Sequence, residues 1–167
     1  KKSKIRIKEK FFKKNTFNIL NIGRLVKQKD QETLLKSLEY INPQINYRLL
    51  IIGNGEEKKN LISFINDKKL NKNVKIIEYQ NNIYPYIKNS NLFALTSRHE
   101  GLPNILIECL ALKRIIISTN CKTGPSEILE NGKYGKLIKV GDFKMIGKSI
   151  SEIYQNYNFY NRKAKQG

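Results

Sequence analysis

Six short apolar runs recur along the chain, separated by segments in which apolar residues have a helical spacing. The runs are rich in Ile, Leu, Val and Phe and cover residues 17–22, 47–52, 74–77, 92–96, 115–118 and 136–140. Several of them are continuously apolar, a pattern typical of strands that are buried on both faces of a parallel sheet. We therefore expect about six parallel strands.

The intervening segments favour amphipathic helices within residues 30–41, 61–70, 103–111 and 143–157. Asp30 is a suitable N-cap for the first, and Pro103 a suitable first residue for the third. The alternation predicts an α/β fold: a Rossmann-like, doubly wound parallel sheet of about six strands with helices on both faces. We place this domain at residues 17–160, with a basic tail or interdomain linker at 1–16 and a polar C-terminal tail at 161–167.

The net charge is the most unusual number in the composition. The 167 residues include 32 Lys and Arg but 14 Asp and Glu, for a formal net charge of +18. Such an excess points to an anionic partner, and a basic α/β module that binds nucleic acid is one alternative. Against it, the Tyr and Phe residues are scattered and form no readable stacking platform. The basic run in residues 1–14, opposed only by Glu9, is also explained as a solvated tail.

Several other classes of protein are disfavoured by what the sequence lacks. Cys109 and Cys121 form no disulfide framework, and with the lone His99 they make no convincing zinc site, so we expect no metal and no cofactor. No apolar run has the length of a membrane span, so a cytoplasmic location is expected. The chain begins with Lys1 rather than Met, which suggests a piece of a longer protein.

In a doubly wound sheet, ligands bind beyond the carboxyl ends of the strands, so the loops there hold the candidate site. Gly23 ends the first run, and Arg24 and Lys29 follow it. Two cations beside a helix start suit a diphosphate, although basic residues on a basic surface are an equally simple interpretation. Gly53 ends the second run in a loop that resembles a dinucleotide fingerprint but has Lys58 at the third glycine position, which argues against nicotinamide binding.

The loop after the fourth run is the most specific feature of the sequence. Glu100 precedes a helix start, where free backbone N–H groups can face an anion. Glu108 lies between Ile107 and Cys109 in an apolar helix, where a carboxylate must find donors. The two hydroxyls of a ribose would supply them. A structural helix residue that points to solvent or caps a polar group remains an open alternative.

Four segments, in this order, resemble the group 1 retaining glycosyltransferases of family GT4. They are NIGRLVKQKD (21–30), LLIIGNGEEKKNL (49–61), NLFALTSRHEGLPNILIECLALKRIIIST (91–119) and GPSEILENGKYGKLIKVGD (124–142). The third contains the Glu-x7-Glu spacing of that family. The resemblance implies one half of a GT-B fold, the carboxy-terminal half that binds the nucleotide-sugar donor. The amino-terminal half, which holds the acceptor, would lie outside this chain.

The resemblance also implies roles for individual residues. Arg24 and Lys29 match the cations on the donor diphosphate, Glu100 matches the carboxylate near the donor sugar, and these three are the catalytic candidates. Glu108 matches the residue that holds the ribose. The other implied donor-binding residues are Gly23, Gly53, Tyr79, Asn82, Ile83, Gly101, Leu102 and Asn104. Of these, Tyr79, Asn82 and Ile83 would border the nucleobase. Asp30 departs from the pattern, because the family often has Gly there.

The implied reaction is transfer of a hexose or N-acetylhexosamine, with retained configuration, from a nucleotide sugar that is expected to be UDP-linked. The implied acceptor is a glycan or lipid-linked glycan in cell-surface polysaccharide or lipopolysaccharide synthesis. Peripheral contact with an anionic inner membrane face would suit the charge, and nucleic acid is not an expected partner. A UDP-sugar epimerase-like domain is a further alternative, against which the Glu-x7-Glu segment argues.

Overall fold

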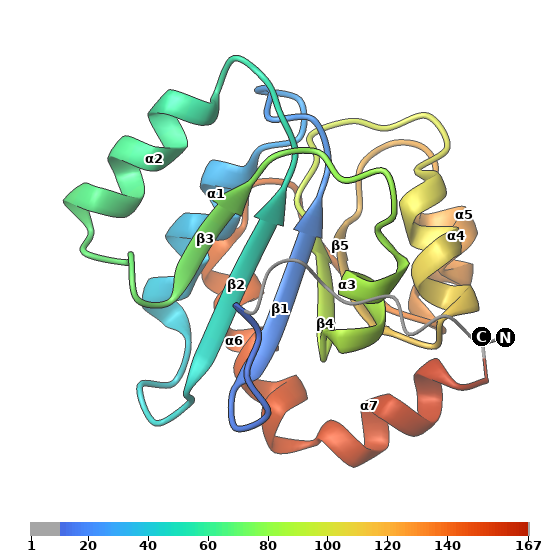
Figure 1. The fold of residues 1–167 in the computed structure, drawn as a ribbon. Helices are drawn as coiled ribbons and strands as arrows, with labels where there is room; N and C mark the ends of the chain where they lie inside the picture. Colours follow the sequence, from blue (N-terminus) through green and yellow to red (C-terminus); the bar gives the residue numbers. More distant parts are fainter. Residues whose placement is uncertain (1–10, 167) are drawn as a thin grey trace, which may run out of the picture.

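A computed structural model describes residues 11–166, whose six strands form one parallel sheet (Figure 1). The strands are β1 Phe17–Ile22, β2 Tyr47–Ile52, β3 Val74–Ile77, β4 Leu92–Leu95, β5 Ile115–Thr119 and β6 Lys136–Ile138. Their order is β3-β2-β1-β4-β5-β6, and each neighbouring pair is parallel. The predicted fold class is confirmed.

Helices cover both faces of this sheet (Figure 1). They are α1 Gln31–Ser37, α2 Lys58–Asp67, α3 Tyr84–Asn89, α4 Asn104–Ala111, α5 Pro125–Ile128, α6 Phe143–Gln155 and α7 Tyr157–Ala164, with short 3-10 turns at Leu38–Tyr40 and Glu130–Gly132. Helices α1, α2, α6 and α7 pack on one face, and α3 and α4 pack on the other. Two separate apolar layers result.

The two layers explain why the strand sequences are continuously apolar. Neighbouring residues of a strand point to opposite faces. In β1, Ile19 belongs to one layer and Leu20 to the other, and both are fully buried. In β4, Leu92 and Phe93 divide in the same way.

Several predicted boundaries differ from the structure by one to three residues, and the ends of β6 and α4 show why. Strand β6 ends at Ile138, not at residue 140, because the Lys139 carbonyl accepts the Asp142 N–H and closes a turn. Pro103 is the N-cap of α4 rather than its first helical residue, and its carbonyl accepts the Leu106 N–H.

The predicted last helix is two helices. Helix α6 ends at Gln155, and α7 begins after Asn156 and extends through Ala164. Ala164 is buried against the sheet, so α7 occupies part of the segment that we expected to be a polar tail.

The segment predicted as a basic tail or linker is described only from residue 11, and residues 1–10 lie outside the described part of the chain. Phe11 and Phe12 pack against the layer that holds α3 and α4. The Arg48 guanidinium lies 4.8 Å from the centre of the Phe11 ring. These contacts attach the described end of the segment to the domain.

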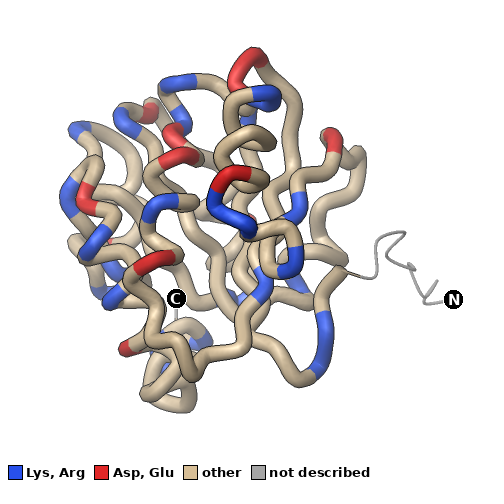
Figure 2. Tube along the Cα trace, turned by 90° about the vertical axis from the view of Figure 1, so that its left-hand side faces the viewer, with Lys and Arg blue, Asp and Glu red and all other residues tan. Residues whose placement is uncertain are grey.

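Lys and Arg residues are dispersed along the chain trace in Figure 2, with Asp and Glu residues between them. Several are paired: Lys36 with Glu32 at 2.6 Å and Lys68 with Glu39 at 2.8 Å. In the described part of the chain, no helix combines the length and apolar character needed to cross a membrane.

Candidate functional site

The candidate site lies where β1 and β4 are neighbours in the sheet. The helices that follow these two strands cover opposite faces, α1 in one layer and α4 in the other. This is the topological switch point, where doubly wound sheets open a crevice beyond their carboxyl ends. The loops that follow β1 and β4, residues 23–30 and 96–103, lie at this point.

Hydrogen bonds join these two loops directly. The Arg98 N–H donates to the Gln28 carbonyl at 2.8 Å, and the Gln28 side-chain amide donates to the His99 carbonyl at 2.9 Å. The Thr96 hydroxyl donates to the Lys29 carbonyl at 3.2 Å. The loops therefore form one unit across the crevice.

Lys29 and Glu100, predicted from separate loops, are in contact. Lys29 Nζ lies 2.6 Å from Glu100 Oε1, and the two side chains are 17% and 6% exposed. The Ser97 hydroxyl donates to the same carboxylate oxygen at 2.5 Å. The Thr123 hydroxyl donates to the Glu100 carbonyl. A cation and a carboxylate are thus held in a fixed arrangement at the crevice.

Arg24 is exposed and lies in the same loop as Lys29. Its guanidinium makes no hydrogen bond or ion pair within the described residues, so it is available for an anionic ligand. Its carbonyl accepts from the Gln31 side-chain amide at 3.0 Å, which holds the loop backbone to the start of α1.

Of the two predicted glycines, Gly53 is required by close packing at the ends of β1 and β2, where the Gly23 backbone lies against it. The Gly23 N–H donates to the Ile52 carbonyl at 3.0 Å. A Cβ on Gly53 would lie 1.9 Å from the Gly23 carbonyl oxygen, so a side chain there would push the first loop away. Their observed role is to set the path of the loop that carries Arg24 and Lys29.

The turn after Glu100 presents free backbone donors. The N–H groups of Gly101, Leu102 and Asn104 make no hydrogen bond within the described residues, and all three residues are exposed. They precede or begin α4, where the helix dipole favours an anion. Their arrangement suits a phosphate or a sugar oxygen.

Glu108 lacks a hydrogen-bond donor for one of its carboxylate oxygens, as its apolar sequence neighbours led us to expect. It lies on α4 and is half-buried, and its Oε2 atom is buried without a hydrogen-bond partner in the described residues. Buried carboxylate oxygens are normally paired. The assignment of Glu108 to the ribose stays a prediction, because a ligand hydroxyl is one of the groups that could supply the missing donor.

The predicted nucleobase residues come from the loop between β3 and α3. Tyr79 is 64% exposed, Asn82 is exposed and accepts the Tyr84 N–H at 3.2 Å, and Ile83 is half-buried as the N-cap of α3. The described residues give no hydrogen bond or ion pair between this loop and Lys29 or Glu100. The nucleobase assignment therefore stays a prediction.

The two cysteines do not supply a reactive thiol to the site. Burial, with the Glu108 carboxylate beside it, raises the pKa of Cys109 well above its ordinary value. Burial and then the Glu100 carboxylate raise the pKa of Cys121. Both thiols stay protonated near neutral pH, and thiolates are the nucleophilic form. Among the described residues, no three or more His, Cys, Asp or Glu side chains are grouped to hold a metal ion.

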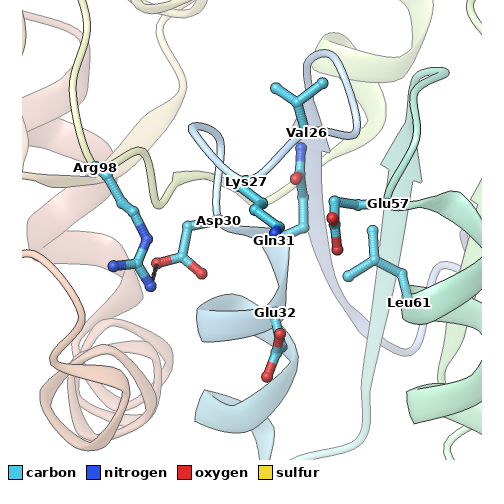
Figure 3. Close-up of a pocket in the computed structure, with 8 residues that line it drawn as sticks. All are labelled: Val26, Lys27, Asp30, Gln31, Glu32, Glu57, Leu61 and Arg98. Atoms are coloured by element: carbon cyan, nitrogen blue, oxygen red, sulfur yellow. Dashed lines mark ion pairs between the residues drawn. The ribbon is translucent and has the colours of Figure 1, made fainter.

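A cavity of about 210 Å³ lies on the outer side of the first loop (Figure 3). Its lining includes Asp30, Gln31 and Arg98, and Arg98 Nη2 lies 3.0 Å from Asp30 Oδ2 (Figure 3). None of the predicted donor-binding residues lines it. The cavity instead lies beside the ion pair between Arg98 and Asp30, and Asp30 is the residue between Lys29 and α1.

Sequence reasoning missed the hydroxyl groups that hold Glu100. Ser97 and Thr123 both contact it, yet neither was assigned a role. The available signal was the position of Ser97, a small polar residue at the buried end of the fourth apolar run, three residues before Glu100.

The sheet order and the helices on both faces define a doubly wound α/β domain, and comparisons identify its family. Residues 2–167 match the model of the family described as "Glycosyl transferases group 1". The chain belongs to that family. It is 39% identical over 153 residues to an uncharacterized glycosyltransferase of Methanocaldococcus jannaschii, covering 83% of this chain and 38% of that protein.

Two Staphylococcus aureus proteins extend the comparison. The capsular polysaccharide biosynthesis glycosyltransferase CapM is 31% identical over 155 residues, covering 89% of this chain and 40% of CapM. The structure of TarM with UDP, fondaparinux and alpha-GlcNAc-glycerol superposes with a TM-score of 0.84 at 25% identity, covering 98% of this chain and 33% of that chain. The chain thus spans about two fifths of the length of these curated relatives.

Proposed function

We propose that this chain is the donor-binding half of a retaining glycosyltransferase that uses a UDP-linked hexose or N-acetylhexosamine. The observation that carries the proposal is the Lys29–Glu100 contact of 2.6 Å at the topological switch point. It puts a phosphate-binding cation beside a carboxylate that can accept sugar hydroxyls. The unpaired Arg24 beside them suits the second phosphate.

In the reaction, the bond between the anomeric carbon and the diphosphate oxygen breaks, and a bond to an acceptor hydroxyl oxygen forms with the configuration retained. Negative charge develops on the departing diphosphate. Arg24, Lys29 and the N–H groups that begin α4 would stabilise that charge by electrostatic preorganisation. Glu100 would orient the donor sugar, and Glu108 would hold the ribose.

The partner of this chain in catalysis is proposed to be an amino-terminal acceptor domain, because the relatives are more than twice as long as their match to it. The proposed acceptor is a glycan or lipid-linked glycan in cell-surface polysaccharide synthesis. The similarity to CapM, a capsular polysaccharide biosynthesis glycosyltransferase, supports this class. The proposed location is the cytoplasm, with peripheral contact to an anionic membrane face.

Calorimetric titration of the 167-residue chain tests the proposal. We expect saturable binding of UDP, UDP-glucose or UDP-N-acetylglucosamine, and weaker binding of GDP and ADP. A single-stranded oligonucleotide serves as the competing ligand. Binding to it alone, with an affinity that falls steeply as salt is raised, would instead support the nucleic-acid alternative.

A further inference from the structure

The Glu100 carboxylate is held through one of its two oxygens. Lys29 Nζ at 2.6 Å and Ser97 Oγ at 2.5 Å both contact Oε1. The other oxygen, Oε2, makes no hydrogen bond within the described residues, and the side chain as a whole is 6% exposed. The arrangement fixes the carboxylate and leaves Oε2 for a ligand hydroxyl.

Ser97 is itself fixed. It follows β4, is fully buried, and accepts the Thr119 hydroxyl at its carbonyl oxygen at 2.6 Å. Thr119 is also fully buried. A hydroxyl in this position has a defined direction, because its own backbone is anchored to the next strand.

Lys29 and Ser97 differ in what a bound donor does to them. A diphosphate attracts the Lys29 ammonium, which the donor must then share with Glu100. Ser97 is uncharged and buried, so the diphosphate does not compete for it. We infer that Ser97 is a positioning residue that keeps Glu100 Oε2 directed at the donor sugar after Lys29 turns toward the diphosphate. This inference rests on the proposed function.

The test compares UDP with a UDP-sugar in Ser97→Ala. We expect affinity for UDP-glucose or UDP-N-acetylglucosamine, whichever wild type binds more tightly, to fall about tenfold, as for a lost hydrogen bond to a charged group. Affinity for UDP should stay within about twofold. Ser90→Ala is the matched control: Ser90 is equally buried, precedes β4, and donates only to the Ile87 carbonyl at 2.9 Å. It should change neither affinity.

Two results would overturn the positioning role while wild type still binds UDP-sugar: equal losses for both ligands, or no loss for either. If wild type binds no UDP and no UDP-sugar, the proposed function fails and the inference fails with it. Should Ser97→Ala not fold, Ser97→Cys keeps the side-chain size with a weaker donor, and the same difference between ligands is expected.

Discussion

Glu108 is a half-buried carboxylate whose Oε2 atom lacks a donor in the described residues. A buried acceptor without a partner carries a desolvation cost that a bound ligand can remove. The two hydroxyls of a ribose would pair with both carboxylate oxygens. Substitution of Glu108 is therefore a direct test of ribose binding.

Glu108→Gln keeps the size of the side chain but replaces one acceptor oxygen with an NH2 donor. We expect binding of UDP to weaken by about 1–3 kcal/mol. The loss should largely vanish for a nucleotide that lacks both ribose hydroxyls. Calorimetry with the two ligands, together with a melting curve, distinguishes ribose binding from a structural role of Glu108. A stable variant with unchanged UDP affinity would show that Glu108 is not part of the site.

Asp30 shows how one residue sets the geometry of a loop. Its backbone is left-handed, with φ 47°, which explains why glycine suits this position. Its side chain offsets the strain by accepting the Thr33 N–H, as an N-cap does, and by pairing with Arg98 at 3.0 Å. The departure from the family pattern is therefore accommodated locally, next to Lys29.

At the scale of elements, the turn before α5 sets the position of the turn before α4. Gly124 has φ 88°, and a Cβ there would lie 2.2 Å from the Gly101 carbonyl oxygen and 2.6 Å from Pro103 Cδ. The close approach of these two turns requires glycine.

Gly124→Ala should therefore lower the free energy of unfolding by about 1–3 kcal/mol and displace the turn after Glu100. Gly132→Ala is the matched control, because Gly132 has φ 92° but no atom within 4 Å of the added Cβ. Urea unfolding should show a larger loss for Gly124→Ala, and only that variant should bind UDP less tightly. Equal losses would mean that backbone strain alone matters.

Glu152 on α6 joins two further elements through its carboxylate. It pairs with Lys136 of β6 and accepts the Tyr160 hydroxyl of α7. Lys136 first, and then Tyr160, lower the pKa of Glu152 below its ordinary 4.5. Burial and this carboxylate raise the pKa of Tyr160 to about 12.

A lowered carboxyl pKa stabilises the folded state above the ordinary value, and the benefit is lost as pH falls through the folded-state pKa. We expect the stability of Glu152→Gln to fall less than that of wild type as the pH drops below about 4.5, the ordinary pKa of the carboxyl group. The exposed Glu127, which has no partner in the described residues, gives the control Glu127→Gln. Identical pH profiles for both variants and wild type in urea unfolding would contradict the linkage.

Elements that depend on buried faces could be predicted from the sequence, and elements that depend on tertiary contacts could not. The continuously apolar strands and the cap at Asp30 are local signals. The break at Asn156 has no Pro or Gly to mark it, and α7 is fixed by burial of Ala164 against the sheet. Lys29 and Glu100 were predictable as candidates, but the Ser97 contact depends on a loop conformation that spacing does not specify.

For the whole molecule, the site residues lie beyond the carboxyl ends of the strands, in the loops that follow β1 and β4 and on α4. The described cavity of about 210 Å³ does not include them, which fits a site completed by a second domain. We expect the 167-residue chain to bind UDP and to transfer no sugar by itself, because closure between two halves supplies proximity and excludes water. Incubation with a UDP-sugar panel and glycan acceptors, read by mass spectrometry, checks this; measurable transfer would contradict it.

The most direct test of the account is whether Arg24 recognises the diphosphate. Calorimetry should compare UDP with uridine in wild type, in Arg24→Ala and in Lys27→Ala, an exposed cation of the same loop that serves as the control. We expect Arg24→Ala to weaken the binding of UDP by about 1.5–3 kcal/mol, as for the loss of a charge-assisted hydrogen bond. The binding of uridine should stay unchanged. Lys27→Ala should alter UDP affinity much less. Equal losses for UDP and uridine, or equal effects of the two variants, would contradict a donor-diphosphate site at this crevice.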